Sequence, residues 1–370
     1  MTARPRPRLR GADAAAVESA LRADEPLSGI GGFAGRLGDR LVRDVLGREP
    51  LFVDDSGEWA FTPRELDDPV PFPAGHATDR ETLGPPDPLA EAGRALSLPD
   101  PDPVDRSDGV DGVRSALASV AADVPEDCPV AFSGGVDSGA VATMTDGPLY
   151  AVGFPESHDL QAAREAADAM DRRLHVVELS HDRLREAVPR VVEATGRTNQ
   201  MDVSIAVPLY LAAEQGAADG HDRLALGQGA DELFGGYAKV ANAPGDTRVE
   251  ADTVRRATRE VLRELPHQLA RDVPALRAAG VEPVTPLLRD EVVRTALRLP
   301  AGALVDGDRR KAALRAAARP LVPASVAERD KKAVQYGSYV SRELDRLARR
   351  AGFKRRTENH VGRYVRSVVE

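Results

Sequence analysis

The sequence predicts an α/β fold: a parallel sheet with helices on both faces, a mainly helical C-terminal part and a small N-terminal antiparallel β layer. Three observations predict it. Short apolar runs alternate with helical stretches between residues 104 and 226, which is typical of a parallel sheet covered on both faces. Glycine-rich turns follow two of these runs. Proline is dense over residues 69–103, as in a linker between two parts of a chain.

The chain divides at these changes of composition into five segments. We expect a small β-rich segment at 1–80, a proline-rich linker with one short helix (88–97) at 81–104, an α/β domain at 105–243, a helical part at 244–350 and a basic tail at 351–370. In the α/β domain, strands are expected at 128–132, 149–154, 174–179 and 223–226, and helices at 109–122, 159–171, 181–195 and 203–218.

Composition indicates a cytoplasmic protein. The 370 residues are 42% apolar, which suffices for a core. No run of about 18 apolar residues occurs, so we expect no membrane span. Cys128 is the single cysteine, so no disulfide can form within one chain. A net charge of −9 with few lysines predicts a salt-adapted, halophilic cytoplasm and argues against nucleic acid as the main partner.

The segment Ser-Gly-Gly-Val-Asp-Ser, which begins at Ser133, lies between the first predicted strand and a helical stretch. The N–H groups of such a turn and the positive end of the helix dipole bind anions, most often phosphate. Gly134 and Gly135 let the backbone approach a phosphate closely. Ser133 and Ser138 add hydroxyl donors, and the Asp137 carboxylate is suited to hold magnesium. A plain turn between strand and helix is the simpler interpretation.

A second glycine cluster, Gly-Gln-Gly-Ala-Asp-Glu, contains Gly227 and Gly229 and follows the fourth predicted strand. The carboxyl ends of parallel strands meet at one edge of a sheet, where ligands bind, so we expect the two clusters to lie together. Asp231 and Glu232 would then point towards bound phosphates, and Asp231 would share one magnesium ion with Asp137. Alone, the second cluster would be read as a helix cap. Together the two clusters predict a nucleotide site.

The two clusters resemble the synthetase domain of asparagine synthetase and its relatives, including β-lactam synthetase, within the pyrophosphate-loop group of ATP pyrophosphatases. Other segments are similar to that family across residues 105–345, namely those that begin at Val152, Val281, Lys311 and Arg329. The resemblance implies an adenine nucleotide α-hydrolase-like fold. It also implies an enzyme that joins a carboxylate to an amine while cleaving ATP to AMP and pyrophosphate, with aspartate to asparagine as the default reaction.

The resemblance implies roles for individual residues. ATP would be held by the α/β domain, with pyrophosphate in the first loop and adenine against the backbone of Phe132, Val152 and Leu226. The nucleotide-binding set is Phe132, Ser133, Gly134, Gly135, Asp137, Ser138, Val152, Leu226, Gly227 and Gly229, with Asp137 and Asp231 as ligands of Mg²⁺. The catalytic set is Lys331, Asp231, Glu232 and Gln228. In this family the counterpart of Lys331 contacts phosphates.

Residues 42–52 resemble, more faintly, a hairpin of the family's glutaminase domain, which uses an N-terminal cysteine as its nucleophile. Thr2 stands at that position here. The resemblance therefore implies a degenerate glutaminase-like segment without that activity. The nitrogen would come from free ammonia, from an amine substrate or from a separate glutaminase.

Two departures from the family pattern concern the acceptor step. Asparagine synthetases carry an acid between the two glycines and β-lactam synthetase carries a tyrosine, whereas this chain has Gln228, which can orient groups but cannot act as a base. Val284 replaces the family's arginine. Three alternatives stay open: an amide or lactam synthetase related to β-lactam synthetase, an enzyme that adenylates a tRNA nucleoside, and a non-catalytic ATP-binding subunit.

Overall fold

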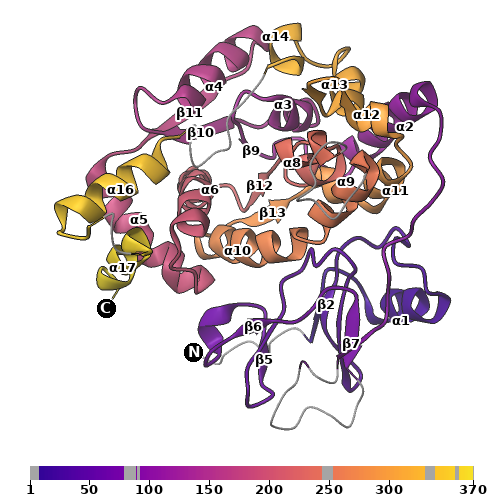
Figure 1. Cartoon of the computed structure of the whole chain (residues 1–370), viewed down its shortest axis with the longest axis horizontal. Helices are drawn as coiled ribbons and strands as arrows, with labels where there is room; N and C mark the ends of the chain where they lie inside the picture. Colours follow the sequence, from indigo (N-terminus) through magenta and orange to yellow (C-terminus); the bar gives the residue numbers. More distant parts are fainter. Residues whose placement is uncertain are drawn as a thin grey trace.

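A five-stranded parallel sheet forms the centre of the protein (Figure 1). The computed structural model describes residues 8–78, 89, 92–243, 253–329, 338–354 and 358–369. The strand order is β11-β10-β9-β12-β13. The chain thus runs outward from β9 through β10 to β11 and then returns to place β12 on the other side of β9. The strands are β9 (Val130–Ala131), β10 (Leu149–Gly153), β11 (Leu174–Glu178), β12 (Arg223–Ala225) and β13 (Glu282–Val284).

Helices cover both faces of this sheet, as predicted. Side chains alternate along β10, so that Leu149 and Ala151 belong to one core and Tyr150 and Val152 to the other. The first core includes α2 (Arg106–Ala121), α3 (Val136–Ala142), α4 (His158–Ala169), α9 (Val254–Leu262), α11 (Asp290–Leu297) and α13 (Ala312–Ala318). The second includes α5 (His181–Thr195), α6 (Gln200–Ala218), α16 (Val340–Arg350) and α17 (His360–Ser367).

Four predicted strands and the four predicted helices of the α/β domain are present, with boundaries shifted by a few residues. The fifth strand, β13, was not predicted, because residues 244–350 were expected to be helical. Pro283 in its centre argues against a strand in sequence alone. The structure places β13 at the edge of the sheet, paired only with β12. Proline is tolerated there because an edge strand has one side on which no N–H is needed.

The remaining elements are short, apart from α10 (Leu265–Ala278), which is largely buried and contributes to both cores. The short elements are α7 (Ala230–Leu233), α8 (Ala238–Ala241), η3 (Pro286–Leu288), α12 (Ala301–Leu304), β14 (Val305–Asp306), β15 (Arg309–Arg310) and α14 (Ala324–Ala327). Of the helices that the structure describes, none is long and apolar enough to cross a bilayer.

The N-terminal part forms two small antiparallel sheets, in agreement with the predicted β layer. The first has the order β1-β2-β3-β7-β8 and the second β5-β4-β6. Their bounds, with one helix and one 3₁₀ turn, are β1 (Leu9–Arg10), α1 (Ala14–Ala23), β2 (Ala34–Leu37), β3 (Arg40–Arg43), β4 (Phe52–Val53), β5 (Trp59–Ala60), η1 (Pro63–Glu65), β6 (Val70–Pro71), β7 (His76–Thr78) and β8 (Ala92–Arg94). The prediction of a short helix at 88–97 is wrong for residues 92–97, which the structure describes. Residues 92–94 pair with β7 instead, so tertiary pairing overrides local helix preference.

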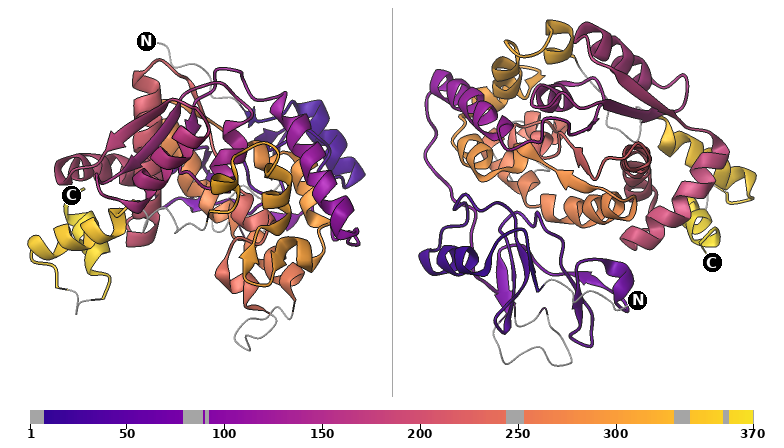
Figure 2. Two further views of the ribbon diagram at one scale, coloured as in Figure 1. Left: turned by 90° about the horizontal axis from the view of Figure 1, so that it is seen from above. Right: turned by 180° about the vertical axis from the view of Figure 1, so that it is seen from behind.

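The N-terminal sheets are joined to the main domain by buried ion pairs, and they lie below α10 in Figure 1 and in the right-hand view of Figure 2. Arg48 donates to Asp44 at 2.9 Å and also pairs with Asp290, the first residue of α11. Glu49 pairs at 2.9 Å with Arg277 near the end of α10. Both acids bonded to Arg48 are buried, so this contact holds the two parts in a fixed arrangement.

The C-terminal residues contribute to the second core. In α17, Val361, Tyr364 and Val365 are buried, while Arg363 and Arg366 are exposed. The segment expected as a basic tail is therefore, over residues 360–367, a packed helix whose arginines face solvent.

Candidate functional site

The two glycine loops meet where the strand order reverses, between β9 and β12. Val130 and Ala225 are paired across these strands, and each loop begins just beyond its strand. Crevices at such reversal points are the usual ligand sites of open α/β sheets. A cavity of about 950 Å³ opens there.

Hydrogen bonds and close packing hold the first loop in shape. The backbone N–H of Ser133 donates to Ser138 Oγ at 3.1 Å, and that hydroxyl lies 3.4 Å from the carbonyl oxygen of Gly135. Gly134 has φ of 74°, and a Cβ there would meet the backbone of Ala162. Only glycine fits this position without strain. Bonds among its own residues and the contact with Ala162 therefore fix the shape of the loop. Helix α3 starts directly after it at Val136.

Lys311 lies between the two carboxylates that were predicted to hold magnesium. Its Nζ is 2.6 Å from Asp137 Oδ2 and 2.7 Å from Asp231 Oδ1. Burial alone would lower the pKa of Lys311, but the Asp137 and Asp231 carboxylates outweigh it and hold this pKa above its ordinary value. The lysine precedes α13 with φ of 57°, in the left-handed region. The backbone therefore turns sharply to direct this ammonium into the site.

The donor set fits a magnesium ion that is shared with phosphates. Asp137 and Asp231 converge on one cationic nitrogen, so their oxygens are placed to converge on a metal cation as well. Among the described residues, no group of three or more histidine, cysteine or acidic side chains is gathered as a metal cage. Magnesium commonly takes one or two carboxylates and completes its octahedron with phosphate oxygens and water.

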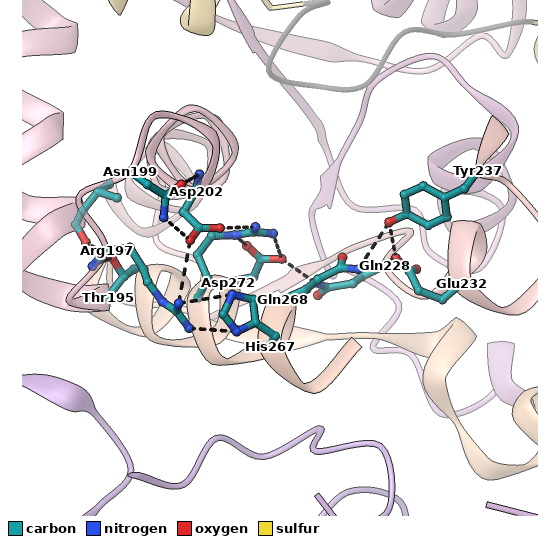
Figure 3. A network of polar contacts seen from close by, with 12 residues as sticks. Thr195, Arg197, Asn199, Asp202, Gln228, Glu232, Tyr237, His267, Gln268 and Asp272 are labelled. Carbon is teal, nitrogen blue, oxygen red and sulfur yellow. Dashed lines mark hydrogen bonds and ion pairs between the residues drawn. The ribbon is translucent and has the colours of Figure 1, made fainter. Parts of the chain in front are cut away.

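A chain of polar contacts lines another part of the cavity (Figure 3). Gln228 Nε2 donates to Asp272 Oδ2 at 2.6 Å. Arg271 donates to Asp272 at 2.6 and 3.0 Å and to Asp202 at 2.9 Å. Asn199, the N-cap of α6, bonds Asp202 in turn at 2.7 Å. We call these five residues the acceptor wall. Burial would lower the pKa of Arg271, but its two carboxylate partners raise it.

Glu232 belongs to a second polar group on the same side of the cavity. Its Oε1 accepts hydrogen bonds from the Tyr237 hydroxyl at 2.6 Å and from Gln268 Nε2 at 2.9 Å. The residue is 3% exposed. Burial, with the nearby charge of Asp231, raises the pKa of Glu232. This carboxyl is therefore easier to protonate than an ordinary glutamate.

Most residues of the predicted site line the one cavity. They are Phe132, Ser133, Gly135, Asp137, Ser138, Val152, Leu226, Gly227, Gln228, Gly229, Asp231 and Glu232. Gly134 is not in the lining, because it packs against Ala162. Lys331 lies outside the described residues, so its role stays a prediction. Val284 ends β13, where its carbonyl accepts the N–H of Leu226.

Five site residues were missed or undervalued in the sequence. Lys311 was noted only as part of a family-like segment, and Asn199 and Asp202 at the start of α6 and Arg271 and Asp272 on α10 were not noted. A signal for Lys311 existed, because lysine is rare in this chain and this one precedes a helix. The Arg-Asp pair on α10 is an ordinary surface pattern in sequence. Only its burial, 5% and 2% exposed, marks it as unusual.

Comparisons with known proteins agree with this geometry. The family model described as Asparagine synthase matches residues 113–367. The "Putative asparagine synthetase 1 (glutamine-hydrolyzing)" of Methanocaldococcus jannaschii is 30% identical over 274 residues, which are 64% of this chain and 50% of that protein. Asparagine synthetase B (glutamine-hydrolyzing) of Escherichia coli is 29% identical over 243 residues, 60% of this chain and 42% of that protein. The chain spans about half the length of the curated relatives it matches.

Proposed function

The chain belongs to the asparagine synthase family, and on this premise we propose that it is an ATP-dependent ligase that forms AMP and pyrophosphate while joining a carboxylate to a nitrogen nucleophile. The observation that carries the proposal is the Asp137–Lys311–Asp231 cluster at the mouth of the first glycine loop. Two acids and one ammonium beside an anion-binding turn are suited to a charged triphosphate and its metal.

The first half-reaction transfers AMP to the carboxylate. ATP binds with its β and γ phosphates against the turn that begins at Ser133, and with adenine between Phe132 and Val152. A substrate carboxylate oxygen attacks the α-phosphorus, the bond to the bridging oxygen breaks, and pyrophosphate leaves with the electron pair. Lys311 stabilises charge on the departing phosphates. Mg²⁺, held by Asp137 and Asp231, supplies further neutralisation of phosphate charge when bound.

The second half-reaction takes place at the acceptor wall. The nitrogen nucleophile attacks the acyl carbon of the adenylate, the bond to the phosphate oxygen breaks, and AMP leaves with the electron pair. The proton that the nitrogen loses passes to solvent water, because Gln228 cannot accept it. Gln228 follows Gly227, where an added Cβ would meet the backbone of Asp137. This close packing of the two loops supports an acceptor wall beside the proposed position of the α-phosphate. Aspartate and ammonia are the default substrates, by analogy with the family.

We favour ammonia, or ammonia from a separate glutaminase, over glutamine hydrolysis within this chain. Its single cysteine, Cys128, is 2% exposed. Burial raises the pKa of this thiol to about 11. A buried thiol of that pKa is a poor nucleophile, because the thiolate is the reactive form.

A pyrophosphate-release assay in high salt, with ATP and Mg²⁺, tests the proposal. The carboxylate arms are aspartate and a panel of other amino acids, each with ammonium or glutamine, and bulk tRNA is the arm for the nucleoside alternative. Carboxylate-dependent release of AMP and pyrophosphate is expected. Release that responds only to tRNA, or to none of the arms, would reject the ligase.

The variant Asp137→Ala should abolish that release. Its matched control is Asp127→Ala, because Asp127 is an exposed acid just before β9 that is not part of the cavity lining. Release by Asp137→Ala at the rate of the unmodified protein would contradict the metal-binding role of the cluster.

A further inference from the structure

We infer that Gln228 presents its side-chain carbonyl oxygen to the nitrogen nucleophile, and that Asp272 is the positioning residue that fixes this orientation. The inference rests on the proposed ligase function and assigns the part of the cavity that binds the nucleophile. Gln228 is in the second glycine loop, Asp272 is 44 positions later on α10, and both face the cavity (Figure 3).

The hydrogen bond between the two side chains decides which end of the amide faces the ligand. An ionised carboxylate only accepts hydrogen bonds, so the NH₂ group of Gln228 must face Asp272. In agreement with this, Gln228 Nε2 donates to Asp272 Oδ2 at 2.6 Å. Oε1 is then directed away from Asp272. It is buried and has no hydrogen-bond partner in the described part of the chain.

A buried acceptor without a partner is rare in proteins and marks a place where a donor is to arrive. The amide cannot rotate to relieve it, because its other end is held by Asp272. A ligand that places an N–H at Oε1 therefore gains a hydrogen bond that the free protein lacks. A ligand that places a carboxylate there meets a second acceptor and is disfavoured.

Asp272 is itself held on both of its oxygens. Arg271 donates to Oδ1 at 2.6 Å and to Oδ2 at 3.0 Å. The far side of the guanidinium donates to Asp202 on α6. This two-sided clamp ties α10 to α6 and uses three of the five N–H donors of Arg271. Its bonds to two carboxylates give the guanidinium a structural role at this wall.

Charge favours a nitrogen donor at the same place. The acceptor wall itself carries two carboxylates and one guanidinium, and Arg197 approaches Asp202 only at 3.9 Å. Arg197 is not part of the cavity lining. The lining therefore presents more negative than positive charge to a ligand, which suits the positive edge of an ammonia or amine nucleophile.

The same geometry explains why an acid is disfavoured at position 228 in this chain. A carboxylate there would face Asp272 at hydrogen-bond distance, and two like charges so close cannot both ionise freely. The Gln228 amide and the Asp272 carboxylate thus form a donor–acceptor pair. Placing the acid at position 228 and the amide at position 272 should preserve their hydrogen bond. If the two residues only supported the fold, this exchange would not restore nitrogen transfer selectively.

The first experiment compares Asp272→Asn with Asp345→Asn. Both aspartates are buried and bonded to an arginine, but Asp345 lies on α16 outside the cavity lining, whereas Asp272 contacts Gln228. In Asp272→Asn the new amide keeps its oxygen towards Arg271 and turns its NH₂ towards Gln228, which then flips and presents NH₂ to the cavity. We expect the KM for ammonium to rise about tenfold. Pyrophosphate release without ammonium should change less than about twofold. Asp345→Asn should leave the KM for ammonium within about twofold.

The second experiment is the exchange, and it keeps the inference falsifiable if Asp272→Asn folds poorly. Gln228→Glu alone should lose nitrogen transfer, because its carboxylate opposes Asp272. The double variant Gln228→Glu/Asp272→Asn should recover it, since the new amide donates to the new carboxylate, whose second oxygen faces the nucleophile. Gln228→Met removes the acceptor and should behave like Asp272→Asn. Correct folding is checked by the melting temperature of each variant.

The outcomes separate this inference from the proposed function. If no carboxylate drives pyrophosphate release in the unmodified protein, the ligase proposal fails. If release occurs but Asp272→Asn and Asp345→Asn affect the KM for ammonium equally, the positioning role is overturned. A single Gln228→Glu as active as the exchange variant would also overturn it. A rise in the KM for the carboxylate rather than for ammonium would assign Oε1 to the other substrate and refute the inference.

Discussion

Replacing Lys311 by methionine should make the Asp137–Lys311–Asp231 cluster depend on a divalent cation. In the unmodified protein the Lys311 ammonium neutralises the two carboxylates. The change preserves most of the volume of the side chain and removes its ammonium. Asp137 and Asp231 then face each other without the nitrogen that lies within 2.7 Å of both. In the unmodified protein the Lys311 ammonium stabilises the two carboxylates, whereas in the variant a cation from solution must do so.

The size of the effect follows from the geometry. Two carboxylates about 5 Å apart repel by about 3 kcal/mol at an effective dielectric constant of about 20. The side chains of Asp137 and Asp231 are 26% and 46% exposed, so solvent screening reduces this penalty. We expect a loss of about 1–3 kcal/mol in the free energy of unfolding, or a few degrees in melting temperature. Because the pKa of Lys311 is raised, its contribution is complete below the unfolded value of about 10.4 and is lost only as the pH rises through the folded value.

The assay is thermal unfolding with and without millimolar MgCl₂ near neutral pH, followed by pyrophosphate release. Magnesium should raise the melting temperature of Lys311→Met more than that of the unmodified protein, because no ammonium competes for the two carboxylates. Pyrophosphate release should still fall, because the charge on the departing phosphates loses a partner. The control is Lys239→Met, since Lys239 is exposed and 5.9 Å from the ring of Tyr237. An identical response of both lysine variants to magnesium would refute the reasoning.

Three further changes probe other parts of the structure. Glu232→Gln should flatten the pH dependence of stability above about pH 4.3: the raised pKa of Glu232 means that the folded state loses stability as the pH rises above the unfolded value, and an amide does not ionise. Gly134→Ala should cost about 1–3 kcal/mol and suppress pyrophosphate release, because φ is 74° and the new Cβ meets Ala162. Arg48→Met should cost about 3–5 kcal/mol, because it leaves two buried carboxylates unpaired between the N-terminal sheets and α11.

Controls and contrary outcomes are available for each. For the first, an identical pH dependence of the melting temperature in Glu232→Gln and the unmodified protein would show that folding does not raise the pKa of this carboxyl. Gly93→Ala is the control for the loop, since a Cβ at Gly93 meets nothing within 4 Å; equal loss in both would reject the packing argument. Arg36→Met removes an exposed pair and should cost less than about 1 kcal/mol. If it costs as much as Arg48→Met, burial is not the reason for the larger effect.

Local pattern was sufficient for the α/β domain and for its two glycine loops. The strands at β9, β10, β11 and β12 are short apolar runs bounded by turns, and the helices between them have the periodicity of a buried face. A parallel sheet places the carboxyl ends of its strands at one edge. For this reason the positions of Ser133, Asp137 and Asp231 near one another could be predicted without coordinates.

Only the tertiary structure decided which side chains complete the site. Lys311 reaches Asp137 across 174 positions and does so from a left-handed turn, a geometry that no local pattern encodes. Asp272 meets Gln228 because α10 packs against α6 below the second loop. Edge pairing likewise made a strand of the proline-containing β13. The sequence by itself determined where the two glycine loops would lie, since that depends on one turn after each of two neighbouring strands. The partners of Gln228 depend on the packing of helices distant in sequence, and this long-range packing decides what the nucleophile encounters.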